Sequence, residues 1–233
     1  MKFLFRRIAA IAAGLIITAL PLQAQTFFRD IDWSVMGTIL FFPEKNGNQS
    51  APMPILPSLG GAASYSLSDL LALEVSLDLY TNTYDYDVTL ERAIPANDEF
   101  RTAFVIGSVL GLQPVFRFHP GKFTIRAYGG LGFDFRIILR ASGLEDDERH
   151  SNNGVPDTGL NLGEARKEVG SYFWGSGRFI YPFIGGGMDF PILESIKLGF
   201  DLRIWMPVWR IWTNEGLSFI HGFRFGAGIR VGF

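Results

Sequence analysis

The chain has 233 residues and no cysteine, so it can form neither a disulfide nor a cysteine-linked lipid anchor. Its formal charge of -2 at neutral pH leaves no basic surplus for binding nucleic acid. Aromatic residues make up 15% of the sequence, and 22 of the residues are phenylalanine. This aromatic content is high for a water-soluble domain of average composition.

The N-terminal residues have the pattern of a secretory signal peptide. Three basic residues precede an uncharged apolar run at residues 8–20, and a candidate cleavage site follows Ala24. The run is shorter than the roughly 20 residues that a helical membrane span requires. We therefore expect residues 1–24 to be a signal peptide and residues 25–233 to form one exported domain.

Eight later segments alternate apolar with polar or small side chains, which is the pattern of a strand with one apolar face. The third segment is the most regular, since leucine and valine occupy every second position from Leu71 to Leu79. The sixth segment is ambiguous in phase, because aromatic residues alternate there with isoleucines. In chain order the predicted strands are residues 32–41, 58–67, 71–80, 103–118, 123–139, 172–190, 196–209 and 219–233.

The connections between these segments alternate between long and short. Tight turns are expected after residue 67 and at residues 119–122, whereas residues 81–101 form a polar loop. The longest connection, residues 140–171, includes a short helix at residues 162–169. Long connections would then share one end of the sheet and tight turns the other. This arrangement predicts an all-β fold, an eight-stranded antiparallel up-and-down transmembrane β-barrel.

The last predicted strand carries apolar side chains on one face and ends on an aromatic residue. This pattern resembles the closing strand of bacterial outer-membrane β-barrels. The whole of residues 25–233 is similar to the small eight-stranded OmpA/OmpX-type and OmpW-like barrels. The resemblance implies a bacterial outer-membrane location and outer-membrane lipids as partners. The sequence leaves the oligomeric state open and favours a monomer. The resemblance also implies that the barrel-assembly machinery recognises a C-terminal signal formed by Phe225, Ile229, Val231 and Phe233.

Side-chain volume indicates which face of the strands meets lipid. An eight-stranded barrel has an interior just wide enough for side chains to fill. The leucines of segment 71–80 and the phenylalanines of segment 123–139 would overfill it, whereas glycine, alanine and serine on the opposite face would fit. We therefore predict that the apolar face points outward to lipid. The alternative is a periplasmic lipocalin-like barrel with these side chains inside.

With the apolar face outward, four acidic and four basic residues point into the lumen. Enclosed charges must pair or lose their charge, so we predict a network of ion pairs that closes the barrel. The alternative is that these charges only solvate a polar face. Lys122, Lys197 and Arg230 are placed near the tight turns and Arg140 near the long loops, within reach of bulk water. The predicted network contains Glu74, Asp78, Arg126, Asp134, Arg136, Asp201, Arg203 and Arg224.

Few residues suggest catalysis or metal binding. His221, with Ser218 and Glu215 nearby, is similar to the outer-leaflet sites of lipid A deacylase barrels, in which a histidine-activated serine attacks an acyl ester. Those enzymes carry the serine two residues after the histidine, where this chain has Phe223. The acidic run at residues 145–148 has oxygen ligands for a divalent cation but matches no EF-hand spacing. We expect no enzyme activity, no cofactor and no bound metal.

Three functions follow from these observations. The first is a non-enzymatic structural or surface-interaction barrel, whose long loops contact a surface ligand from a rigid support. The second is a narrow porin-like channel for small or hydrophobic solutes, as the OmpW-like resemblance implies. The third, a lipid-modifying enzyme of the outer leaflet, depends on His221.

Overall fold

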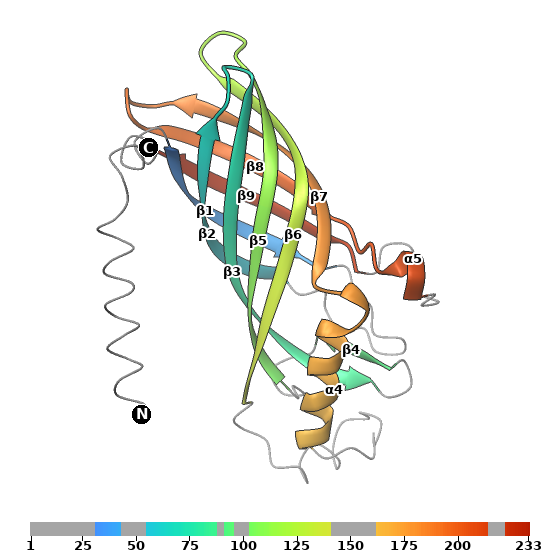
Figure 1. The fold of residues 1–233 in the computed structure, drawn as a ribbon. Coiled ribbons are helices and arrows are strands. Elements are labelled where there is room, and N and C mark those ends of the chain that lie inside the picture. The colour runs from blue at the N-terminus through green and yellow to red at the C-terminus, as the bar shows by residue number, and fades with distance from the viewer. Residues whose placement is uncertain (1–30, 43–54, 88–90, 96–102, 141–161, 214–221) are drawn as a thin grey trace, which may run out of the picture.

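The computed structural model describes residues 31–42, 55–87, 91–95, 103–140, 162–213 and 222–233. Nine strands form one antiparallel sheet, and eight of them, all except β4, close it into a barrel (Figure 1). Closure comes from β1, which pairs with both β2 and β9, and from the pairing of β2 with β3. The barrel strands are β1 (Ile31–Phe41), β2 (Ile55–Ser66), β3 (Leu71–Asp87), β5 (Ala103–Phe118), β6 (Thr124–Arg140), β7 (Ile180–Pro191), β8 (Lys197–Trp205) and β9 (Arg224–Gly232). The predicted fold class is confirmed.

The barrel has one end with tight turns and one with longer connections. Short connections join β2 to β3, β5 to β6 and β7 to β8, and we call this side the turn end. The opposite side, the loop end, carries β4 (Arg92–Pro95), α4 (Leu162–Trp174) and α5 (Arg210–Thr213), as Figure 1 shows. Among the described residues, no helix combines the length and the apolar character needed to cross a membrane.

The apolar face of the strands points outward. In β3, Leu73 and Leu77 are 43% and 42% exposed, while Glu74 and Asp78, the residues that directly follow them, are buried at 1% each. The same alternation holds along β6, where Ile137 is 64% exposed. Large apolar side chains on the outer face of the described strands are left about half exposed, so their favourable surrounding is hydrocarbon. The lipocalin-like arrangement, with leucines inside the barrel, is therefore wrong.

The structure corrects the predicted strand at residues 172–190. Helix α4 continues to Trp174, a 3-10 turn, η2 (Gly175–Gly177), follows, and β7 begins only at Ile180. The buried residues of α4 are four apart, the spacing of one helical face, and they are Ala165, Val169 and Phe173. Residues 172–174 therefore continue this helix, although the alternating aromatic residues predicted a strand there.

Other strand ends also differ from the prediction. β3 runs seven residues further, to Asp87, and β4 pairs with that extension where a polar loop was expected. β8 ends at Trp205 instead of residue 209, and a turn and α5 follow. The described part of the last strand begins at Arg224, after a turn in which Gly222 has a φ of 82°. A positive φ suits glycine and interrupts an extended strand.

The structure also settles the facing of β7. Tyr181 and Phe183 are buried in the lumen and Ile184 faces outward at 53% exposure. The aromatic residues of this strand therefore fill the barrel interior. They join a buried cluster with Leu40, Phe42 and Trp205, in which the rings of Phe183 and Trp205 lie 6.1 Å apart.

Candidate functional site

A carboxylate shared by two arginines lies in the part of the lumen nearest the loop end. Asp134 accepts a hydrogen bond from Arg224 at 2.6 Å and forms an ion pair with Arg136 at 2.9 Å. The hydroxyl of Tyr80 donates to the other oxygen of Asp134 at 2.8 Å. Arg224 also lies over the ring of Tyr181, 3.9 Å from its centroid. Two positive charges are thus held by one carboxylate and by aromatic rings.

The middle of the lumen holds a second set of contacts. Arg203 donates to Asp78 at 2.8 Å and to the hydroxyl of Tyr128 at 3.3 Å. Tyr128 in turn donates to Asp201 at 2.7 Å. The remaining terminal nitrogen of Arg203 lies 2.9 Å from the sulfur of Met36. Strands β1, β3, β6 and β8 therefore meet across the interior, because the barrel is narrow enough for opposite walls to bond.

A third set of contacts lies nearest the turn end. Arg126 donates to both oxygens of Asp189 and to both oxygens of Asp201, at 2.7–3.1 Å. Arg230 holds Glu74 with both terminal nitrogens, the longer bond measuring 3.2 Å. The side-chain amide nitrogen of Gln113 donates to the same carboxylate at 2.6 Å. These bidentate contacts use the planar geometry of guanidinium and carboxylate.

The structure places all eight predicted lumen charges inside the barrel, each in contact with a group of opposite charge. Two further members were missing from the prediction. Arg230, expected to reach bulk water, is only 7% exposed. Asp189 lies on β7, whose facing the sequence left open. Tyr181 and Asp189 are an even number of residues apart on β7, so their side chains lie on the same face of the strand. Knowing that Tyr181 is buried would therefore have placed Asp189 in the lumen.

Two glycines accommodate tyrosines of this network. Gly107 of β5 lies directly opposite Tyr80 of β3, and a Cβ atom added to it would overlap the tyrosine ring. Gly185 of β7 faces Tyr128 of β6 in the same way. Glycine at these positions lets each ring lie flat against the neighbouring backbone, where its hydroxyl reaches an aspartate across the lumen.

A small apolar core lies at the loop end, next to the charged network of the lumen. Phe173 of α4 is 1% exposed and packs edge-on against Tyr84 of β3, with ring centroids 4.7 Å apart. The guanidinium of Arg136 lies 4.1 Å from the centroid of the Phe173 ring. The other buried members of this core are Ala93, Ala103, Val105 and Val169. Helix α4 is thus fixed to the lumen-facing side of the strand extensions.

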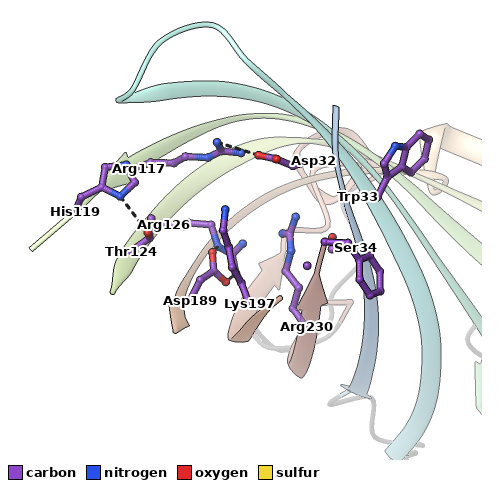
Figure 2. Close-up of a pocket in the computed structure, with 12 residues that line it drawn as sticks. Asp32, Trp33, Ser34, Arg117, His119, Thr124, Arg126, Asp189, Lys197 and Arg230 are labelled. Carbon is purple, nitrogen blue, oxygen red and sulfur yellow. Dashed lines mark hydrogen bonds and ion pairs between the residues drawn. The ribbon is translucent and has the colours of Figure 1, made fainter. Parts of the chain in front are cut away.

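At the turn end the lumen opens as a pocket, which we call the turn-end mouth (Figure 2). Residues of β1, β5, β6, β7, β8 and β9 line it. Four of them carry a positive charge, Arg117, Arg126, Lys197 and Arg230, and two carry a negative one, Asp32 and Asp189.

The other predicted features are the C-terminal signal, the residues around His221 and the acidic run at residues 145–148. In the predicted C-terminal signal, Ile229 of β9 and Phe233, which directly follows β9, are 51% and 61% exposed, and Phe225 and Val231 are half-buried. His221, Ser218 and Glu215 lie outside the described residues, as do residues 145–148. Within the described ranges, no group of three or more histidine, cysteine, aspartate or glutamate residues could hold a metal ion.

Together, the closed sheet, the apolar exterior and the paired interior charges define the class of protein: a transmembrane β-barrel. No protein-family model matches the chain, and no curated protein matches it. Several solved structures do.

Three of the similar structures are bacterial barrel proteins. The outer membrane protein OprG from Pseudomonas aeruginosa has a TM-score of 0.48 at 10% identity, covering 88% of this chain and 96% of OprG. The N-terminal β-barrel domain of Pseudomonas aeruginosa OprF has a TM-score of 0.39 at 14% identity, covering 87% and 97%. Neisserial surface protein A has a TM-score of 0.41 at 12% identity, covering 87% and 96%. At these identities the similarity concerns the fold alone.

Proposed function

We propose that this protein is a bacterial outer-membrane barrel that acts without catalysis, as a closed scaffold presenting a surface for contacts at its loop end. The observation that carries the proposal is the ion-pair network. Five arginines and five carboxylates pair within the lumen, from Asp189 and Arg230 near the turn end to Arg224 and Arg136 near the loop end. Such a packed interior favours a scaffold over a wide pore.

The loop end supplies the surface. Helix α4 and strand β4 stand on the extensions of β3, β5 and β6 and are held there by their own apolar core. In outer-membrane barrels the tight turns face the periplasm and the longer loops the exterior. In that orientation a rigid platform, built from α4, β4 and these strand extensions, faces the medium and meets a surface ligand. The signal peptide and the C-terminal strand would deliver the chain to the outer membrane through the barrel-assembly machinery.

A narrow conduit for small or hydrophobic solutes, similar to OmpW-like barrels, is the second candidate. One observation favours it: aromatic and aliphatic side chains, including Phe42, Phe183 and Trp205, line the lumen toward the loop end. A hydrophobic solute would find an apolar surface there once the ion pairs had separated. The lipid-modifying enzyme depends on His221, and a His221→Ala variant with unchanged lipid acylation would argue against it.

Planar-bilayer recording of the refolded protein separates the scaffold from the conduit. We expect no stable current steps, because side chains paired across the lumen should obstruct a continuous water path. The shift in gel migration on heating verifies that the same sample is folded. A double variant, Arg203→Ala with Asp78→Ala, removes one central pair and should produce current steps, which shows that the assay detects opening. Stable steps from the unmodified protein would contradict the closed scaffold and favour the conduit.

A further inference from the structure

The turn-end mouth has a charge arrangement that the closed scaffold does not require. Its positive groups come from four different strands: Arg117 from β5, Arg126 from β6, Lys197 from β8 and Arg230 from β9. Figure 2 shows Lys197 and Arg230 rising in the same direction from neighbouring strands. The mouth opens to the solvent on the turn side and lies at the outer edge of the ion-pair network.

Two of these four cations are already fully engaged by acidic groups. Arg126 is held by Asp189 and Asp201, and both terminal nitrogens of Arg230 are bound to Glu74. Asp189 has both oxygens occupied by Arg126. The carboxylates inside the mouth are therefore largely neutralised by neighbours, and they repel an incoming anion less than free carboxylates would.

Two cations keep capacity for a ligand. Arg117 binds the hydroxyls of Ser64 and Ser66 at 2.7–2.8 Å, and its ion pair with Asp32 is long, at 3.5 Å. Asp32 is 50% exposed at its side chain, so water screens its charge. Lys197 is exposed and forms no ion pair with any described residue. Its ammonium group thus offers three free donors at the mouth.

The register of β8 and β9 brings Lys197 close to Arg230. Lys197 lies opposite Gly232 and Arg230 lies opposite Gly199, so the two cations are diagonal neighbours on the same face, with Cα atoms about 7–8 Å apart. Like charges at this separation repel each other. Gly232 leaves room beside Lys197, since the nearest atom to a Cβ added there would be 3.8 Å away. An anion in this space would relieve the repulsion.

We propose that the turn-end mouth binds a single oxyanion, a carboxylate or phosphate group carried by a molecule on the turn side of the membrane. Lys197 donates to the anion directly, and Arg117 supplies a second donor by weakening its long contact with Asp32. Arg230 contributes through its field, because its terminal nitrogens stay on Glu74. This inference goes beyond the proposed function, since the ligand sits outside the closed part of the lumen and need not pass through it.

The test is a titration of the refolded full chain in detergent micelles, followed by NMR. Inorganic phosphate and acetate are added in separate series, and the amide signals of Gly199 and Gly232 are monitored. We expect saturable shifts, and Lys197→Gln should weaken the apparent affinity about fivefold, the effect of losing one partly exposed ion pair. Lys197→Arg should retain saturation. Lys122→Gln is the matched control, because Lys122 lies in the neighbouring β5–β6 turn but outside the mouth.

Each outcome bears on the inference. Saturation by phosphate alone supports a phosphate-bearing ligand, and saturation by acetate supports a carboxylate. Shifts that never saturate with either anion would overturn the inference. An equal loss of affinity in Lys122→Gln and Lys197→Gln would also overturn it, since general charge at the rim would then explain the binding.

Discussion

Asp134 is the residue on which the network near the loop end depends. Its carboxylate is buried and contacts Arg136, Arg224 and Tyr80. The Asp134→Asn variant would leave two buried guanidinium groups without a counter-charge, so we expect the free energy of unfolding to fall by about 3–5 kcal/mol. Urea unfolding in phospholipid vesicles measures this change. Asp32→Asn, which removes a half-exposed partner of a long ion pair, should cost less than about 1 kcal/mol. Equal losses in the two variants would contradict the network.

Gly107 tests the packing of the tyrosines. In a Gly107→Ala variant the added methyl group would overlap the ring of Tyr80, and Tyr80 cannot move without losing its bond to Asp134. We expect a loss of about 1–3 kcal/mol in the free energy of unfolding, the usual cost of overpacking. Gly37→Ala is the control, because a Cβ atom at this outward-facing position meets nothing within 4 Å. A Gly107→Ala variant as stable as Gly37→Ala would show that the ring has room to move.

At the level of elements, Phe173 is the largest fully buried side chain by which α4 contacts the barrel. Phe173→Ala removes the edge-on contact with Tyr84 and the stacking of Arg136, and burial of this size is worth roughly 3–5 kcal/mol. The barrel strands keep their own pairing, so we expect faster hydrogen exchange in residues 162–174 with little change in β1, β8 and β9. Lys167→Ala, which alters an exposed side chain on the same helix, is the control. Faster exchange throughout the barrel would contradict local attachment.

The elements also show what the sequence could predict. Period-two rows of large apolar residues fix the strands that face lipid, and β5 begins and ends where the pattern predicts, at Ala103 and Phe118. The outward face follows from volume, because an eight-stranded interior cannot hold the leucines of β3. Strand β4 could not be predicted, because its four residues are too few to show a period. Its formation depends on pairing with an extension of β3.

The sequence predicted only part of the ion-pair network in the lumen. Alternation along a strand predicts which side chains point into the lumen. It does not predict how deep in the barrel each side chain lies or which residue of another strand lies opposite. Arg230 was therefore expected near water, although Glu74 of a distant strand reaches it. Asp189 was missed because glycines and mixed aromatic residues give β7 no clear apolar face. Which side chains meet across the lumen depends on the stagger of all eight strands around the barrel, and the sequence of a single strand does not contain that information.

At the level of the whole molecule, the strands on one side of the barrel are longer than those on the other. β3 and β6 have 17 residues each, whereas β8 and β9 on the other wall have nine each. A transmembrane strand needs about 9–11 residues, so the long strands extend past the membrane at the loop end. That extension is the support of α4 and β4. The short wall spans the bilayer and little more, which places the platform to one side of the barrel opening.

An apolar belt that contacts lipid predicts how the whole molecule responds to an outward charge. Leu77 faces outward from β3 between Gly61 of β2 and Leu110 of β5, well inside the span. Leu77→Arg should lower the free energy of unfolding in phospholipid vesicles by about 2–4 kcal/mol, since a charge near the bilayer midplane loses its hydration. Leu67→Arg is the matched control: Leu67 is 59% exposed but lies in the turn after β2, where water reaches the charge and the cost should be below about 1 kcal/mol. If both variants unfolded at the same urea concentration as the unmodified protein, the belt would not be in hydrocarbon. The closed barrel would then have to be explained as a water-soluble fold with its leucines exposed, which the cost of hydrating so many apolar side chains opposes.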